Sequence, residues 1–291
     1  MRISANSLAF SWLLGLLSAL PTFGIDMILP TLPATGAALG VPAADIGLAM
    51  SVYLLGLGAA IPLCGPLSDR IGRRPIVFFG CALLIAGSIG CLFAQSLPEL
   101  LLFRALQGFG AAGPGLGAIT IVRDLFDGEE ARAKMSYVVF AVNVVPMIAP
   151  TVGAALMTIG DWRTVYWVPI AGGGLLFIAM FYLNETARLD PRARFGLLAA
   201  APDYLTVLAN PICLGHTLCN AAGAGAVFAY ITGSSLFLIQ VVGLTPHQYG
   251  LVFGASSLSV MVGSLLNQRL AGWGITPRQM MSTGLALSTA L

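Results

Sequence analysis

Two ionisable side chains lie within stretches of the sequence that are otherwise apolar. Asp26 stands between Ile25 and Met27, and Arg104 follows Phe103. A charge held in hydrocarbon costs roughly 3 kcal/mol or more, so Asp26 must face water, find a partner or hold a proton. A guanidinium keeps its charge and therefore needs a carboxylate, carbonyl groups or water. Asp26 is thus a candidate proton carrier, and Arg104 is a candidate functional cation.

Each of these residues has a simpler alternative. Asp26 precedes Pro30 and Pro33, so it can be a hydrated acid at the outer end of its apolar stretch. Arg104 lies early in its own stretch, so its long side chain can extend to the membrane interface. Both alternatives stay open at the level of sequence.

A cluster of charge lies between the second and third apolar stretches. Its polar and glycine positions are Gly65, Asp69, Arg70, Gly72, Arg73 and Arg74. Arginines at such a place orient membrane proteins, whereas an acid such as Asp69 contributes little to orientation. Gly65 would permit a close helix contact and Gly72 a tight turn. Asp124, at the end of a later apolar stretch, can pair with one of the arginines.

Membrane-spanning helices must position these residues. Apolar residues make up 57% of the 291-residue chain and charged residues only 9%, and the mean hydropathy is +0.89. An ordinary soluble domain has about 25% charged residues. A helix of about 20 apolar residues crosses the hydrocarbon of a bilayer. Nine such segments are predicted, near 8–29, 46–66, 75–95, 98–122, 135–158, 164–183, 211–240, 248–268 and 277–291.

The positions of lysine and arginine predict the orientation. With the N-terminus in the cytoplasm of a bacterial inner membrane, 12 of the 14 basic residues fall on the cytoplasmic side. Arg163 is then outside, and Arg104 lies within a span. The basic residues expected on the cytoplasmic side are Arg2, Arg70, Arg73, Arg74, Arg123, Arg132, Lys134, Arg188, Arg192, Arg194, Arg269 and Arg278.

The longest polar connection follows the sixth segment. We therefore predict a six-helix bundle over residues 1–183, a cytoplasmic linker over 184–210 and a partial second bundle over 211–291. A faint repeat supports this division, because a glycine precedes a polar residue by four positions at 65–69 and again at 263–267. Transporters are often built from such related halves.

Other classes of protein find little support. The five cysteines form no CxxC pair and only two histidines are present, so neither a metal nor a cofactor is expected. No basic run with interleaved aromatic residues suggests nucleic-acid binding. No motif pairs His216 or His247 with a nucleophile, so an enzyme is not expected. The segment before Asp26 also has features of a cleaved signal peptide, but its apolar run continues too far.

Several motifs together resemble the major facilitator superfamily. The loop at 65–74 resembles the signature loop of that family, and Arg104, Gln107, Gly108 and Gly110 resemble its proton-coupling motif in the fourth span. Ala149, Pro150 and Gly153 are similar to its antiporter motif, although alanine replaces two of the glycines. Gly24, Asp26, Pro30 and Pro33 resemble the bicyclomycin/chloramphenicol-resistance subfamily of drug/proton antiporters.

The resemblance implies an all-α polytopic fold and proton-coupled efflux of hydrophobic drugs. Asp26 would be the proton or cationic-substrate site and Arg104 its coupling partner. Asp69, Arg73 and Asp124 would form a cytoplasmic charge relay that latches the outward-facing state.

The alternatives are an exporter of an amino acid or another small metabolite and a non-transporting fragment, because members of the family have two complete halves and this chain is expected to be truncated at its C-terminus. The residues expected to line the substrate pocket are Phe23, Met27, Phe140, Asn143, Asn220, Phe228 and Tyr230.

Overall fold

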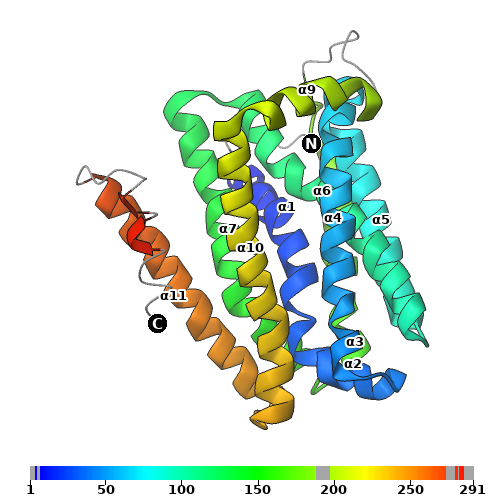
Figure 1. The fold of residues 1–291 in the computed structure, drawn as a ribbon. Coiled ribbons are helices and arrows are strands. Elements are labelled where there is room, and N and C mark those ends of the chain that lie inside the picture. The colour runs from blue at the N-terminus through cyan, green and yellow to red at the C-terminus, as the bar shows by residue number, and fades with distance from the viewer. Residues whose placement is uncertain (1–3, 5–6, 188–196, 273–278, 281, 285–291) are drawn as a thin grey trace.

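The protein is almost entirely helical over the part of the chain that the structure describes. The computed structural model describes residues 4, 7–187, 197–272, 279–280 and 282–284, and no β-strand occurs among them. Figure 1 shows long helices standing side by side, with α9 lying across one end. The elements are α1 (Leu8–Asp26), η1 (Leu29–Thr31), α2 (Leu32–Leu39), α3 (Ala43–Ile46), α4 (Leu48–Ile71), α5 (Arg73–Phe93), α6 (Leu97–Leu125), α7 (Gly128–Leu156), η2 (Trp162–Tyr166), α8 (Trp167–Tyr182), α9 (Leu197–Ala209), α10 (Pro211–Leu236), η3 (Phe237–Val241) and α11 (Pro246–Gly272).

Seven helices within the described residues are long and apolar enough to cross a membrane. They correspond to the first seven predicted segments. The eighth prediction, 248–268, falls on α11, which is a helix of 27 residues but is not among those seven. Most of the ninth predicted segment lies outside the described residues, as do Arg2, Arg188, Arg192, Arg194 and Arg278.

The long helices alternate in direction, and most of the described basic residues gather at one end of the bundle. We call this the charged end, where α4 ends and α5 begins, and the other the opposite end, where α2 and α3 lie (Figure 1). Arg123 and Lys134 flank the turn between α6 and α7 at the charged end, whereas Arg163 lies in η2 at the opposite end. This separation is the one predicted from the sequence; the side of the membrane on which each end lies stays a prediction.

Prolines interrupt the first span. Pro30 and Pro33 lack an N–H group, so neither can complete the α-helical hydrogen bond to the carbonyl group four residues earlier, that of Asp26 or Leu29. The α-helix accordingly ends at Asp26, and the chain continues through η1 into α2. The sequence predicted one continuous segment near 8–29 and did not predict this break. With η1 and α2 included, the first candidate span reaches from Leu8 to Leu39.

Glycines bring α4, α5 and α6 into close contact. A Cβ atom at Gly80 of α5 would approach the carbonyl oxygen of Gly110 to 2.7 Å, and one at Gly113 would approach the carbonyl oxygen of Ile76 to 2.7 Å. A Cβ atom at Gly108 would overlap the backbone of Tyr53. Small residues let membrane helices approach closely, so Gly108, Gly110 and Gly113 of α6 serve packing.

The second part of the chain meets the first mainly at the opposite end. A Cβ atom at Gly250 of α11 would lie 3.0 Å from the Cα atom of Thr151, and one at Gly254 would lie 3.0 Å from the carbonyl oxygen of Met147. Figure 1 shows α11 leaving this contact with α7 and diverging from the other helices toward the charged end.

Candidate functional site

Arg104 is fully buried and satisfied by backbone carbonyl groups and one amide. Its guanidinium donates to the carbonyl oxygens of Gly24 at 2.9 Å and Ala49 at 3.2 Å, and to Oε1 of Gln107 at 2.5 Å. The guanidinium carbon also lies 4.4 Å from the centre of the Tyr53 ring. Its exposed fraction is 0%, so the alternative of an arginine extended to the interface is wrong.

Arg104 and Tyr53 both bind backbone carbonyl groups in the C-terminal part of α1. The hydroxyl of Tyr53 donates to the carbonyl oxygen of Pro21 at 2.9 Å, while Arg104 binds the carbonyl of Gly24 one turn later. Gln107, which receives one Arg104 bond, donates through Nε2 to Ser88 at 2.7 Å. The side chains of α4, α5 and α6 thus form a polar brace against the segment of α1 that precedes Asp26.

Asp26 is buried at the break of the first span. Its exposed fraction is 2%, which disagrees with a hydrated acid at the membrane surface. Its side chain makes no hydrogen bond or ion pair with any residue that the structure describes. It lies within electrostatic range of Tyr53 and Tyr249. Asp26 and Arg104 are therefore not an ion pair in this conformation; Arg104 instead binds the backbone of Gly24, two residues before Asp26, and Tyr53 lies within electrostatic range of both side chains.

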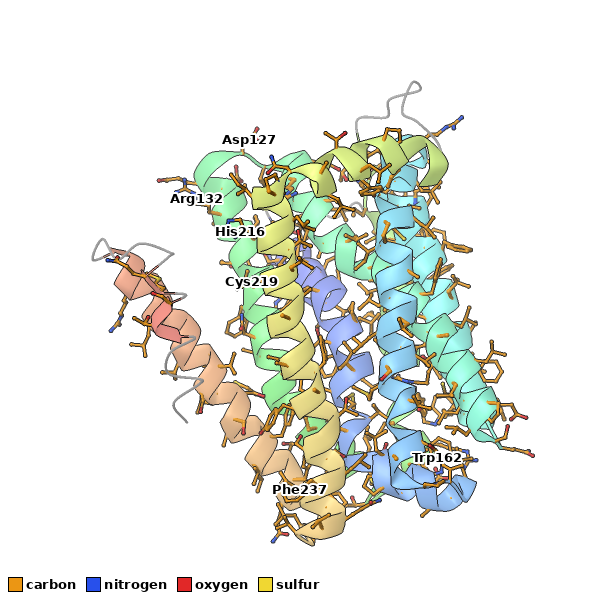
Figure 2. The ribbon with its side chains drawn as sticks, in the orientation of Figure 1. Asp127, Arg132, Trp162, His216, Cys219 and Phe237 are labelled. Atoms are coloured by element: carbon orange, nitrogen blue, oxygen red, sulfur yellow. The ribbon has the colours of Figure 1, made fainter. Side chains whose placement is uncertain are left out.

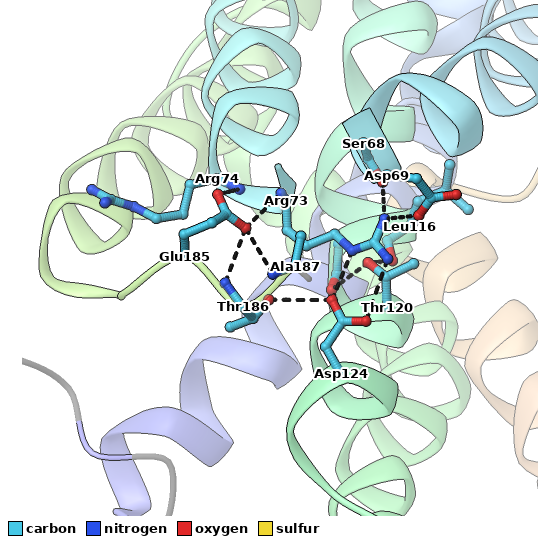
Figure 3. Close-up of polar contacts among 11 residues, drawn as sticks. Ser68, Asp69, Arg73, Arg74, Leu116, Thr120, Asp124, Glu185, Thr186 and Ala187 are labelled. Carbon is cyan, nitrogen blue, oxygen red and sulfur yellow. Dashed lines mark hydrogen bonds and ion pairs between the residues drawn. The ribbon is translucent and has the colours of Figure 1, made fainter. Parts of the chain in front are cut away.

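The charged residues of the 65–74 loop meet Asp124, as the sequence predicted. Nε of Arg73 lies 2.8 Å from Oδ2 of Asp124, and its Nη1 lies 2.5 Å from Oδ1 of Asp69 (Figure 3). The guanidinium also donates to Ser68. The Arg73 side chain is only 12% exposed, so it joins the ends of α4, α5 and α6 in a partly dehydrated setting.

Glu185 caps the start of α5, a role that was not predicted from the sequence. The carboxylate accepts hydrogen bonds from the backbone N–H groups of Arg73 at 2.8 Å and Arg74 at 3.1 Å, which open α5 (Figure 3). The first N–H groups of a helix have no intrahelical partner and attract an anion. The signal was available, because α5 begins after Gly72, a residue without a capping side chain, and an acid stands just beyond α8.

Gly72 makes this contact feasible in two ways. Its φ of 107° lies in the region that favours glycine, and a Cβ atom there would lie 2.7 Å from the carboxyl carbon of Glu185. Thr186, next in the chain, donates to Asp124 at 3.4 Å. The segment after α8 therefore contacts the charge cluster twice, through Glu185 at the backbone of Arg73 and through Thr186 at Asp124.

Other predicted residues of this loop behave differently. Arg74 turns away from the cluster and donates through Nε to the carbonyl oxygen of Met180 at 3.0 Å. Arg70 is exposed in the last turn of α4. The expected close helix contact at Gly65 is wrong for this conformation, because no heavy atom of the described residues lies within 4 Å of a Cβ atom placed there.

The antiporter-like motif packs closely despite its alanines. Pro150 is buried in α7, and a Cβ atom at Gly153 would overlap the carbonyl oxygen of Met27. Gly153 thus allows α7 to cover the backbone directly after Asp26. The motif contributes to the burial of Asp26 through packing.

An apolar cavity of about 780 Å³ lies between α1 and α7 in their halves nearest the charged end. Its larger side chains are those of Trp12, Tyr137 and Phe140. Of the residues predicted to line a pocket, Phe140 lines this cavity, and Asn220 and Phe228 line a hollow of about 580 Å³ along α10. His216 and Cys219, labelled in Figure 2, line the same hollow. Phe23, Met27, Asn143 and Tyr230 line neither.

Metal chemistry has no evident centre in the described part of the chain. No group of three or more histidine, cysteine, aspartate or glutamate side chains gathers there. A helical bundle with a buried acid, a braced arginine and an apolar cavity is the arrangement of a membrane transporter rather than an enzyme.

Comparison with known proteins defines that class. Residues 14–291 match the family model described as Major Facilitator Superfamily. The fold is similar to that of a bacterial homologue of the human lysosomal transporter Spinster, in an inward-facing and unoccupied conformation, with a TM-score of 0.73, 21% identity, and coverage of 94% of this chain and 64% of that one. A D-xylose–proton symporter is also similar, with a TM-score of 0.64, 16% identity and coverage of 91% and 70%.

Some relatives share a higher sequence identity with this chain than these solved structures do. An uncharacterised MFS-type transporter, YdgK of Bacillus subtilis, is 30% identical over 91% of this chain and 67% of its own length. A bicyclomycin resistance protein homologue of Haemophilus influenzae is 28% identical, with coverage of 92% and 68%. The multidrug resistance protein MdtL of Shigella dysenteriae is 29% identical, with coverage of 92% and 67%.

The chain belongs to the major facilitator superfamily, and it is a multi-pass membrane transport protein. It spans about two thirds of the length of the relatives that it matches.

Proposed function

We propose that this chain belongs to a proton-coupled antiporter that exports hydrophobic drugs across the bacterial inner membrane. The proposed orientation places the N-terminus and the charged end in the cytoplasm. Residues 1–183 would form the first bundle, 184–210 the linker and 211–291 part of the second bundle. The observation that carries the proposal is Asp26, a carboxylate that is 2% exposed and has no hydrogen-bond or ion-pair partner among the described residues.

A carboxylate in that setting is suited to exchange a proton for a cargo. Without a counter-ion, burial favours the protonated, uncharged form, and contact with water favours the ionised form. Protonation from outside would favour release of the cargo, and deprotonation inside would favour its capture. Such coupling requires each ligand to bind one conformation better than the other. Arg104 would act by holding α1 in place beside this site.

The cavity supports a hydrophobic cargo. It is lined by aliphatic and aromatic side chains with two serines, Ser11 and Ser136, and the tyrosine Tyr137 as its side-chain hydroxyl groups. A metabolite such as an amino acid would need more polar partners to replace its hydration. Two of the relatives are named for resistance to bicyclomycin or to multiple drugs, which agrees with an apolar cargo.

The test is ethidium efflux from drug-sensitive cells that express the full product of the gene, with and without a proton gradient. Asp26→Asn should abolish gradient-dependent efflux, because the amide cannot bind and release a proton. Asp45→Asn, at an exposed acid of α3, is the matched control and should transport normally. Undiminished gradient-dependent efflux by Asp26→Asn would contradict the assignment of Asp26 as the proton site. Efflux by the 291-residue chain alone would show that these residues are sufficient for transport.

A further inference from the structure

The contact between the two parts of the chain at the opposite end combines apolar packing with hydrogen bonds from hydroxyl groups. Ser235 of α10 is fully buried and donates through Oγ to the carbonyl oxygen of Leu29 in η1. Pro33, four residues later, lacks an N–H group, so within its own helix this carbonyl accepts the N–H of Leu32, three residues later. A carbonyl oxygen has two lone pairs, so it also accepts the hydroxyl of Ser235, and a side chain from the second part of the chain thereby binds the break in the first span.

A second pair of hydroxyls lies next to this contact. The hydroxyl of Tyr249 in α11 lies 3.4 Å from Oγ of Ser234, the neighbour of Ser235 in α10. Tyr249 is fully buried, and Ser234 is 8% exposed. Both α10 and α11 contact η1, which begins three residues after Asp26. Tyr249 packs in the same apolar cluster as Ile25, Ile28 and Leu29.

Asp26 lies near Tyr249, one of these hydroxyl-bearing residues. Tyr249 is close enough to interact electrostatically with its carboxylate, and the backbone that leads from Asp26 to Leu29 is covered by α7 through Gly153. Separation of α10 and α11 from η1 would break the Ser235 bond and uncover this backbone.

We propose that Ser234, Ser235 and Tyr249 form the gate between Asp26 and the solvent at the opposite end. The proposal rests on the proposed function of Asp26 as the proton site. Hydroxyl groups suit a gate, because each bond broken on opening is replaced by a bond to water, so the net cost of opening is small.

A reporter cysteine tests this gate directly. Thr31 is fully buried in η1 behind the contact, so Thr31→Cys should react slowly with a membrane-impermeant maleimide. The reagent is added from each side of membrane vesicles in turn, and labelling of the same chain with Thr31 intact is subtracted to remove the five native cysteines. Ser235→Ala and Tyr249→Phe, each combined with the reporter, should raise labelling from the opposite end roughly two- to tenfold, as expected for the loss of one net hydrogen bond.

Tyr230→Phe is the matched control. Tyr230 forms a similar tyrosine–serine pair between the same two helices, with its hydroxyl 3.3 Å from Oγ of Ser256, but its side chain is 52% exposed and makes no hydrogen bond to η1 among the described residues. Its loss should leave the labelling rate unchanged. If Tyr230→Phe raises labelling as much as Tyr249→Phe, or if neither gate variant raises it, the gate is overturned. Labelling does not require proton coupling. The labelling result therefore tests the gate separately from the effect of Asp26→Asn on efflux.

Discussion

Replacement of Glu185 tests whether the segment after α8 stabilises the charge cluster. In Glu185→Ala the backbone N–H groups of Arg73 and Arg74 lose their acceptor, and so do those of Thr186 and Ala187. The first two open α5 and have no intrahelical partner. We therefore expect the variant to be less stable, through fraying at the start of α5.

The magnitude follows from the geometry. Loss of a helix N-cap costs about 0.5–2 kcal/mol, and a hydrogen bond to a charged group is worth about 1.5–3 kcal/mol. Glu185 is only half-buried, and water replaces part of what is lost, so we expect a cost of roughly 2 kcal/mol. Glu185→Gln keeps one carbonyl oxygen as an acceptor and should lose about half as much.

The assay is thermal unfolding of the purified protein in detergent, followed by tryptophan fluorescence. A cost of about 2 kcal/mol corresponds to a fall in Tm of roughly 3–5 °C for a chain of this size. Glu99→Ala is the control, because the exposed Glu99 accepts a single bond from the N–H of Gln95 beside the start of α6. If Glu185→Ala lowers Tm no more than Glu99→Ala does, the carboxylate does not act as the cap described.

Two further predictions concern packing and the buried arginine. Gly56→Ala should lower Tm markedly because the new Cβ atom would overlap the carbonyl oxygen of Ala105, whereas Gly65→Ala should leave Tm unchanged because its Cβ would meet no neighbour; equal shifts would contradict the contacts of α4. Arg104→Lys should cost roughly 1–3 kcal/mol, measured by the same unfolding assay, since an ammonium cannot reach three acceptors in the planar arrangement of a guanidinium and would leave buried carbonyls unpaired. Unchanged stability in Arg104→Lys would mean that the carbonyl contacts of Gly24 and Ala49 contribute little.

Much of the architecture could be predicted from the sequence because hydrocarbon imposes a simple rule. Every backbone polar group of a spanning segment must be satisfied within the segment, so a run of about 20 apolar residues forms a helix. Charge then fixed the alternation of the helices, since basic residues collect at one end. The pairing of Asp124 with an arginine of the 65–74 loop was also predictable, because the ends of α4 and α6 are on the same face of such a bundle.

Tertiary structure decided which polar groups are actually partners. The sequence suggested that Asp26 and Arg104 are coupled, yet Arg104 binds backbone carbonyls and Gln107, while Asp26 has no such partner among the described residues. The reason is that a carbonyl oxygen can accept a second hydrogen bond, and a buried donor binds the acceptor that the packing places nearest rather than the one of opposite charge. Glu185 and Ser235, unremarkable in the sequence, likewise bind backbone groups at the start of α5 and in η1. A local pattern predicts where a helix begins or breaks, and only the packed fold determines which side chain reaches that point.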